Sequence, residues 1–336
     1  MPFFELVPPG THIDFIGRRR ICLFVSIAMI LAGIAAVVVR GGVPMGIDFR
    51  GGTELQVLFD EGVAVDEARI REVVAGVGIT DATVVRFGEE GGSEYLVKFA
   101  GEIDAAPPEE APGVGEEEPA PTAAKDRVVL IESALRQEIG DFTEQRVEFV
   151  GPRVGAELRE DGTNALLISA ICILIYIAFR FSSRYAPGAI LAVVHDLAIT
   201  GGILVILGVE FDLRILAAML AILGYSLNDT IIIYDRIREN LDLRTSADLE
   251  EVLNTSVNQT LSRTVLTSIT TIVALTSLYV LGGEVIRPFA LAMLIGVLVG
   301  TYSSVFIASP MLLFLERRYG GGGGKSSGRR GAKAAA

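Results

Sequence analysis

The chain has 336 residues, of which 51% are hydrophobic, and its mean hydropathy is +0.50. Such apolar composition excludes an ordinary soluble globular protein and predicts an integral membrane protein. The net charge of -12 comes mostly from one hydrophilic block over residues 54–161, so nucleic acid is not expected as a partner. No phosphate-binding loop, zinc-ligand spacing or Ser-His-Asp arrangement is present, so we expect neither a metal nor another cofactor, and no enzyme.

The first 40 residues predict a surface segment followed by a membrane span. Residues 1–20 mix aromatic side chains, prolines and the triplet Arg18–Arg20, which is typical of a segment lying at the cytoplasmic membrane surface. Residues 21–40 form the first span, because positions 21–39 are all uncharged. No small-residue cleavage motif follows, which favours a retained anchor over a removed signal peptide.

Residues 41–162 predict one hydrophilic domain of mixed strands and helices. Alternating apolar residues at Leu55, Val57 and Phe59 indicate a first strand. The later elements are a helix at 65–77, strands at 82–88 and 94–100, a helix at 126–139 and a strand at 143–150. This order is β-α-β-β-α-β, the arrangement of an α+β ferredoxin-like domain.

One segment of this domain predicts no regular structure. Residues 103–124 hold five prolines and five glutamates with almost no large apolar side chain. We expect a disordered loop there.

The remainder of the chain predicts five further membrane spans. An amphipathic connector over 235–262, with Ser246 as a candidate N-cap, separates the fourth span from the fifth. The Gly-rich, basic tail at 316–336 is expected to be disordered. The five spans lie at about 163–179, 187–209, 213–234, 263–282 and 288–315.

Arginines in the short loops predict the orientation of the chain. Those at 18–20, 180–184, 236–244 and 317 onward fall on one side, and only Arg214 and Arg287 fall on the other. The positive-inside rule then places both termini in the cytoplasm and the domain 41–162 in the periplasm. The predicted fold is a polytopic α-helical protein with six transmembrane helices and one periplasmic domain between the first two.

Asp229 is the first candidate site residue, because it lies within the apolar fourth span. It is five residues before Tyr234, or about 7 to 8 Å inside the membrane if the helix leaves the bilayer there. A carboxylate at that depth is costly and usually marks an ion or proton pathway. Asn228 and Ser226 lie within the same helical turn as supporting polar residues. A structural ion pair with another helix is the alternative interpretation.

Arg263, at the start of the fifth span, is a candidate partner for that carboxylate. An arginine snorkelling to the interface is the alternative. Thr267 and neighbouring hydroxyls give this helix a polar face suited to packing or to a hydrated path. A nearby arginine would keep Asp229 ionised until motion separates the two side chains.

His195 and Asp196 in the third span complete the candidate proton relay. They lie about 12 Å from the cytoplasmic start of that span, close to the level of Asp229. Adjacent helical residues point about 100° apart, so only one of them is expected to face Asp229. A structural hydrogen bond between helices is an equally good interpretation of His195.

Several stretches resemble the SecF branch of the SecD/SecF family of bacterial protein-export membrane proteins. They are GIDFRGGTELQV after the first span, GPRVGAEL before the second, VVHD in the third, GYSLNDTIIIYDRIREN across the fourth and LNTSVNQTLSRTVLTSITTIVAL into the fifth. The likeness covers nearly the whole chain outside the segment 103–124 and the tail.

This resemblance implies a proton-motive-force-driven motor of the resistance-nodulation-division superfamily in the cell inner membrane. It implies SecD as the pseudo-symmetric partner, with the SecYEG channel, YajC, YidC, exported precursor proteins and the lipid bilayer as further contacts. By motif, Asp229 would be the proton-linked carboxylate and Arg263 its charged partner. A self-contained small-solute exporter and a passive scaffold of the export channel are the alternative functions.

Overall fold

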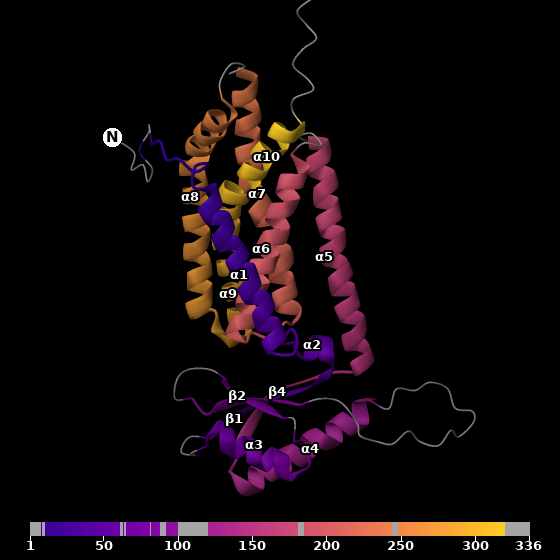
Figure 1. The fold of residues 1–336 in the computed structure, drawn as a ribbon. Helices are drawn as coiled ribbons and strands as arrows, with labels where there is room; N and C mark the ends of the chain where they lie inside the picture. Colours follow the sequence, from indigo (N-terminus) through magenta and orange to yellow (C-terminus); the bar gives the residue numbers. More distant parts are fainter. Residues whose placement is uncertain are drawn as a thin grey trace, which may run out of the picture.

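The computed structural model divides into a helical bundle and a smaller sheet domain below it (Figure 1). The residues that it describes are 8, 11–60, 63, 65–80, 82–87, 92–99, 120–180, 185–243 and 248–319. The sheet domain is inserted between the first and second long helices of the bundle.

Six helical stretches in the described part are long and apolar enough to cross a membrane, so the chain is a polytopic helical membrane protein. The sixth stretch is continuous but contains a π-helical turn between two α-helices. The helices are α1 (Arg19–Val39), α5 (Pro152–Arg180), α6 (Ala186–Leu207), α7 (Leu213–Leu243), α8 (Leu249–Leu281), α9 (Gly283–Ser303), η1 (Ser304–Ala308) and α10 (Ser309–Tyr319).

Several helices extend beyond the predicted spans. Helix α5 begins at Pro152 rather than 163, and its first turns lead from the sheet domain into the bundle (Figure 1). Helix α7 continues to Leu243 and helix α8 begins at Leu249, so the predicted connector 235–262 is divided between two helices, and its part from Leu249 onward is continuous with the fifth span. The N-cap of α8 is Asp248, whereas the predicted cap Ser246 lies outside the described residues.

Two segments predicted to be disordered are partly helical. Helix α10 reaches Tyr319, so residues 316–319 are ordered, and 320–336 lie outside the described residues. Helix α4 begins at Ala120, inside the predicted loop 103–124, of which 103–119 also lie outside. Amphipathic helices therefore run further than the apolar windows indicated, because polar turns add to a helix that packing has already stabilised.

The sheet domain has four antiparallel strands in the order β2-β3-β1-β4. Helices α3 and α4 cover one face of the sheet, on the side away from the bundle (Figure 1). A short helix at the entrance to the domain was not predicted. The elements are α2 (Ile47–Arg50), β1 (Gly52–Phe59), α3 (Glu67–Gly76), β2 (Thr83–Phe87), β3 (Glu94–Phe99), α4 (Ala120–Glu138) and β4 (Phe142–Val150).

The core of this domain follows from alternation along β1. Leu55, Val57 and Phe59 point to the helix-covered face and are buried against Ile131 and other apolar residues of α3 and α4. On the opposite face of β1, Glu54 and Gln56 are polar and lie toward the bundle, and Leu58 is a partly exposed apolar residue. The domain therefore has one apolar face that holds it together and one polar face toward the membrane helices.

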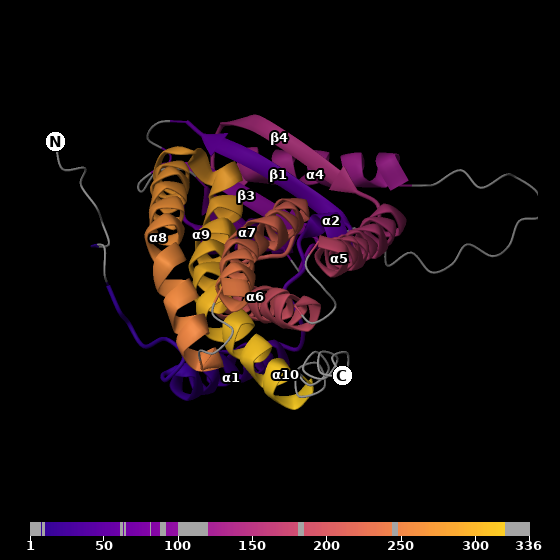
Figure 2. The same ribbon diagram turned by 90° about the horizontal axis from the view of Figure 1, so that it is seen from above.

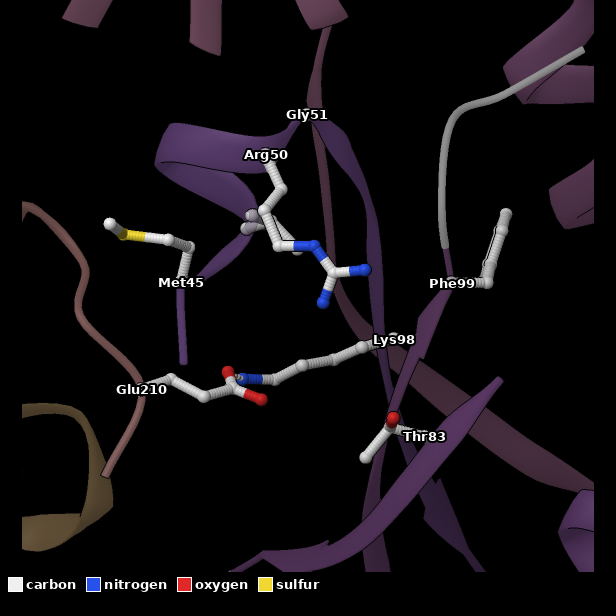
Figure 3. Close-up of a pocket in the computed structure, with 8 residues that line it drawn as sticks. Met45, Arg50, Gly51, Thr83, Lys98, Phe99 and Glu210 are labelled. Carbon is white, nitrogen blue, oxygen red and sulfur yellow. Dashed lines mark hydrogen bonds and ion pairs between the residues drawn. The ribbon is translucent and has the colours of Figure 1, made fainter. Parts of the chain in front are cut away.

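Lys98 of β3 connects this polar face to the bundle. Its Nζ lies 2.6 Å from Glu210 in the loop between α6 and α7 and 3.5 Å from Glu54 of β1. Burial would lower the pKa of Lys98, but the hydrogen bond and charge of Glu210 and the charge of Glu54 together raise it. The side chains of Lys98 and Glu210 meet at a pocket of about 60 Å³, which Arg50 and Thr83 also line (Figure 3).

Backbone hydrogen bonds hold the chain beside this ion pair. The amide of Phe211 donates to the carbonyl of Pro44 at 2.7 Å, and the amide of Gly46 donates to the carbonyl of Phe211 at 2.8 Å. The linker between α1 and α2 is thereby fixed to the loop between α6 and α7.

Gly51 joins α2 to β1 at a crowded corner of the domain. Its φ of 75° is a left-handed conformation that favours glycine. A Cβ there would lie 2.8 Å from Cα of Pro152, the first residue of α5. The entrance and exit of the sheet domain therefore touch through backbone atoms.

Within the bundle, α6, α7 and the sixth stretch form the centre, and α1, α5 and α8 form the periphery. About half or more of the apolar window is buried in the first three, but only 11 to 17% in the others. The same arrangement is visible from above (Figure 2). Glycines allow the closest approaches: a Cβ on Gly33 of α1 would lie 2.8 Å from Cα of Gly202 in α6.

Candidate functional site

Asp229 lies in the middle of α7, where packing of the central helices removes it from the surface. Its exposed fraction is 2%, and its Oδ2 is buried without a hydrogen-bond partner. A buried, unpaired carboxylate oxygen is costly in a low-dielectric interior, and more so at membrane depth. Oδ2 of Asp229 can thus bind a proton or accept a hydrogen bond from a donor that approaches it.

Arg263 of α8 acts on Asp229 through charge rather than contact. The arginine side chain is exposed, and it forms neither an ion pair nor a hydrogen bond with the carboxylate. Its positive charge nevertheless attracts the Asp229 carboxylate, because α7 and α8 pack side by side. The next residue, Thr264, has a buried hydroxyl that also lacks a partner.

The supporting residues named from the sequence separate into two environments. Ser226 is buried on α7, but Asn228 is exposed on the same helix. The hydroxyl of Thr267 donates to carbonyls of its own helix, at 3.0 Å to Arg263 and 2.9 Å to Thr264. The hydroxyl of Thr267 therefore contacts its own backbone rather than Asp229.

Asp196 of α6 is the best-connected carboxylate of the bundle. It is 1% exposed, and its Oδ2 accepts a bond from Ser303 of α9 at 2.7 Å and another from Ser226 of α7. Its Oδ1 lies 2.8 Å from Nδ1 of His195. Asp196 thus joins three central helices, whereas Asp229 has no such partners.

His195 extends this network to α1. Its Nε2 lies 2.9 Å from the hydroxyl of Ser26, which lies 3.1 Å from the hydroxyl of Tyr302 on α9. That tyrosine hydroxyl donates to the carbonyl of Cys22 at 2.6 Å. The His195 and Tyr302 rings stack with centroids 6.0 Å apart.

Only part of the predicted site is brought into direct contact. Asp196 meets Ser226 of α7 and His195 meets Ser26 of α1, so neither forms a hydrogen bond with Asp229, which one of them was expected to face. Sequence reasoning missed Ser26, Tyr302 and Ser303. Hydroxyl residues are common in membrane helices as packing groups, so nothing in the sequence marked these three.

Within the described ranges, no group of three or more His, Cys, Asp or Glu side chains could hold a metal ion. The groups that the described residues bring to this site are carboxyl and imidazole groups, which can bind protons, and hydroxyls, which form hydrogen bonds.

Comparison with known proteins places this arrangement in a family. Residues 130–318 match the C-terminal model of the protein export membrane proteins SecD and SecF, and residues 38–63 match the SecD/SecF GG motif. The second match includes Gly51 at the corner between α2 and β1.

Relatives with similar sequences cover nearly the whole chain. The protein translocase subunit SecF of Desulfurispirillum indicum is 40% identical over 92% of this chain and 93% of its own length. That of Magnetococcus marinus is 42% identical over 91% and 93%. The SecDF subunit of Brucella abortus is 39% identical over 92% of this chain, which spans only 38% of that longer protein.

Solved structures give the same result. The crystal structure of SecDF from Thermus, a translocon-associated membrane protein, matches 92% of this chain with a TM-score of 0.78 and 34% identity. This chain spans 39% of that protein. The chain therefore belongs to the SecD/SecF family of protein export membrane proteins.

Proposed function

We propose that this chain is the SecF subunit of a motor that uses the proton motive force to export proteins. In the inner membrane it would work with SecD on precursor proteins that leave the SecYEG channel. The observation that carries the proposal is the unpaired, buried carboxylate of Asp229. Protonation removes the cost of keeping its charge in the bilayer, so this group responds directly to proton supply.

Arg263 couples that proton to helix packing. While Asp229 is ionised, the arginine attracts it and favours close approach of α7 and α8. A bound proton cancels the attraction and allows the two helices to shift. One charge that crosses 100 mV supplies about 2.3 kcal/mol, so several protons drive one pulling step.

A shift of α7 has a route to the sheet domain. The amide of Leu213, the first residue of α7, has no helical carbonyl to bind and donates instead to Oδ2 of Asp48 in α2 at 3.0 Å. Glu210, just before α7, binds Lys98 of the sheet. Movement at the proton site therefore reaches the domain through two polar contacts at the start of the same helix.

The partner surface is the polar face beside Asp229. Asn228 and Arg263 are exposed at membrane depth, where lipid contact is costly for an amide and a cation. We infer that SecD covers this face. In the SecDF chains of Brucella and Thermus, the part that matches this chain is less than half of the length. The remainder of those chains supports a SecD unit as the neighbour.

We further propose that the sheet domain is a ferredoxin-like domain in the periplasm. Support comes from the order β1-α3-β2-β3-α4-β4, from the sheet order β2-β3-β1-β4 and from the positive-inside rule applied to the short loops. Asp196 and His195 are proposed as further members of the proton-linked network.

Export driven by a proton gradient in membrane vesicles tests the proposal. We expect Asp229→Asn to abolish stimulation by the gradient while co-purification with SecD stays intact. The matched control is Asp242→Asn, which makes the same change at an exposed position of the same helix and should retain full stimulation.

The possible outcomes separate the rival functions. Normal stimulated export in Asp229→Asn would remove the motor and favour a passive scaffold. Proton-coupled solute movement by this chain alone, without SecD, would favour a solute exporter. Loss of stimulation in both variants would mean that removal of any negative charge from α7 is sufficient to abolish stimulated export.

A further inference from the structure

The hydrogen bonds around His195 fix the positions of their protons. The Cys22 carbonyl oxygen can only accept, so the proton in its 2.6 Å bond belongs to the Tyr302 hydroxyl. The contact between Ser26 and Tyr302 at 3.1 Å then has to use the serine proton. Each hydroxyl has a single proton to donate, so both are now assigned.

The imidazole must supply the next proton in this chain. Since the Ser26 hydroxyl donates to Tyr302, it can only accept from Nε2 of His195 at 2.9 Å. Nε2 therefore carries a hydrogen. A second proton is needed on the other side of the ring, because Nδ1 and Oδ1 of Asp196 lie 2.8 Å apart and two lone pairs would repel.

That second proton belongs to the imidazole rather than to the carboxyl group. The Asp196 carboxylate already accepts from Ser226 and Ser303, and hydrogen bonds of this kind favour its ionised form. An imidazole ordinarily binds a proton more tightly than a carboxylate does. The stacked ring of Tyr302 presents its face to the imidazole, which favours a cation there.

We propose that His195 and Asp196 form an imidazolium–carboxylate pair, which holds one proton in addition to that of a neutral histidine. The pair has no net charge, as its burial at membrane depth requires. It binds α1 through Ser26, α9 through Ser303 and α7 through Ser226. It is a second proton-binding site, and it positions the turn of α7 that precedes Asp229.

The groups around the pair leave its charge balance unchanged. Tyr302 of α9 faces the pair through its ring, and its hydroxyl donates to the Cys22 carbonyl of α1. Asp229 is one turn further along α7 and forms no hydrogen bond with the pair. The described side chains that contact the pair therefore supply no other charge that could replace the second proton.

Nitrogen NMR of the histidine ring tests this inference directly. The sequence has only two histidines, so His12→Ala leaves His195 as the single signal in the full-length protein, labelled with ¹⁵N-histidine in lipid bilayers. An ordinary histidine is about 3% protonated at about pH 8. We expect the spectrum of His195 at this pH to show mostly imidazolium, with both ring nitrogens carrying hydrogen.

Two variants test whether the imidazolium signal of His195 depends on Asp196. Asp196→Asn in the single-histidine protein should convert the signal at that pH to neutral imidazole. Thr270→Ala, which removes an exposed hydroxyl from α8, should leave the imidazolium signal unchanged. If Asp196→Asn does not fold, the spectrum of the single-histidine protein decides alone.

A neutral imidazole in the single-histidine protein at about pH 8 would overturn the inference, whichever ring nitrogen carries the hydrogen. The measurement does not depend on export. It can therefore fail while the motor proposal stands, and it can succeed even if Asp229→Asn exports normally.

Discussion

Replacing Lys98 by methionine should release the sheet domain from the bundle. The change removes the ammonium group but keeps a side chain of similar length in the pocket shown in Figure 3. Glu54 and Glu210 then lose their shared cation and repel each other. The side chains of Lys98 and Glu54 are 18% and 13% exposed but that of Glu210 is 38% exposed, so water screens part of the interaction and the effect falls toward the lower end of the range below.

The size of the effect follows from the contact. Unit charges about 4 Å apart attract by about 4 kcal/mol at an effective dielectric constant near 20, before desolvation is subtracted. Net values for hydrogen bonds to charged groups are about 1.5 to 3 kcal/mol. A loss of that size makes local opening roughly 10- to 100-fold more frequent.

Amide hydrogen exchange of the protein in lipid nanodiscs measures this opening. The reporting amides are those of Gly46 and Phe211, whose bonds hold the two linkers beside Glu210. The control is Arg69→Met, which breaks ion pairs at the exposed end of the sheet domain and should not change exchange at Phe211. Exchange at both reporting amides within twofold of the unchanged protein in Lys98→Met would refute the reasoning.

Three further changes test the bundle. Because Arg263 acts on Asp229 through charge, Arg263→Lys should retain gradient-stimulated export and Arg263→Gln should lose it; equal loss in both would indicate a role for guanidinium geometry. Gly33→Ala places a Cβ 2.8 Å from the backbone of α6 and should destabilise the protein by about 1 to 3 kcal/mol, which is measured as a lower Tm in detergent. Gly224→Ala, whose Cβ meets open space, is the control and should leave the Tm unchanged. Asn254→Ala removes the side chain that binds the N-terminal segment to α8, so trypsin should cut that segment faster; an unchanged cleavage rate would show that the segment is held by other contacts.

The spans and the candidate carboxylates could be predicted from the sequence because membrane insertion leaves a local signal. A long apolar run identifies a helix, and a charge such as Asp229 within it is conspicuous. The ends of the helices could not be predicted in this way. Polar turns at Pro152 and Leu249 have no apolar signature, and tertiary contacts stabilise them as helix.

The partners of each site residue were also beyond the sequence. Ser26 reaches His195 across 169 positions, and Ser303 reaches Asp196 across 107. Such pairs depend on how the helices cross, which no spacing within one helix specifies. The sequence singled out Asp229 and Arg263 as a pair, but the structure brings hydrogen-bond partners to Asp196 instead.

The π-helical turn η1 changes the side of the last helix that faces the bundle. Its bonds span one residue more than those of an α-helix, so every side chain of α10 is rotated by about 100° relative to an uninterrupted continuation of α9. The Ala308 carbonyl within this turn accepts from the Tyr234 hydroxyl at 3.0 Å, and the Ser309 hydroxyl donates back to Ser304 at 3.1 Å. A regular helix drawn over 283–318 would therefore assign Leu312 and its neighbours to the wrong face. Loss of a single residue at this turn would present a different set of side chains to α6.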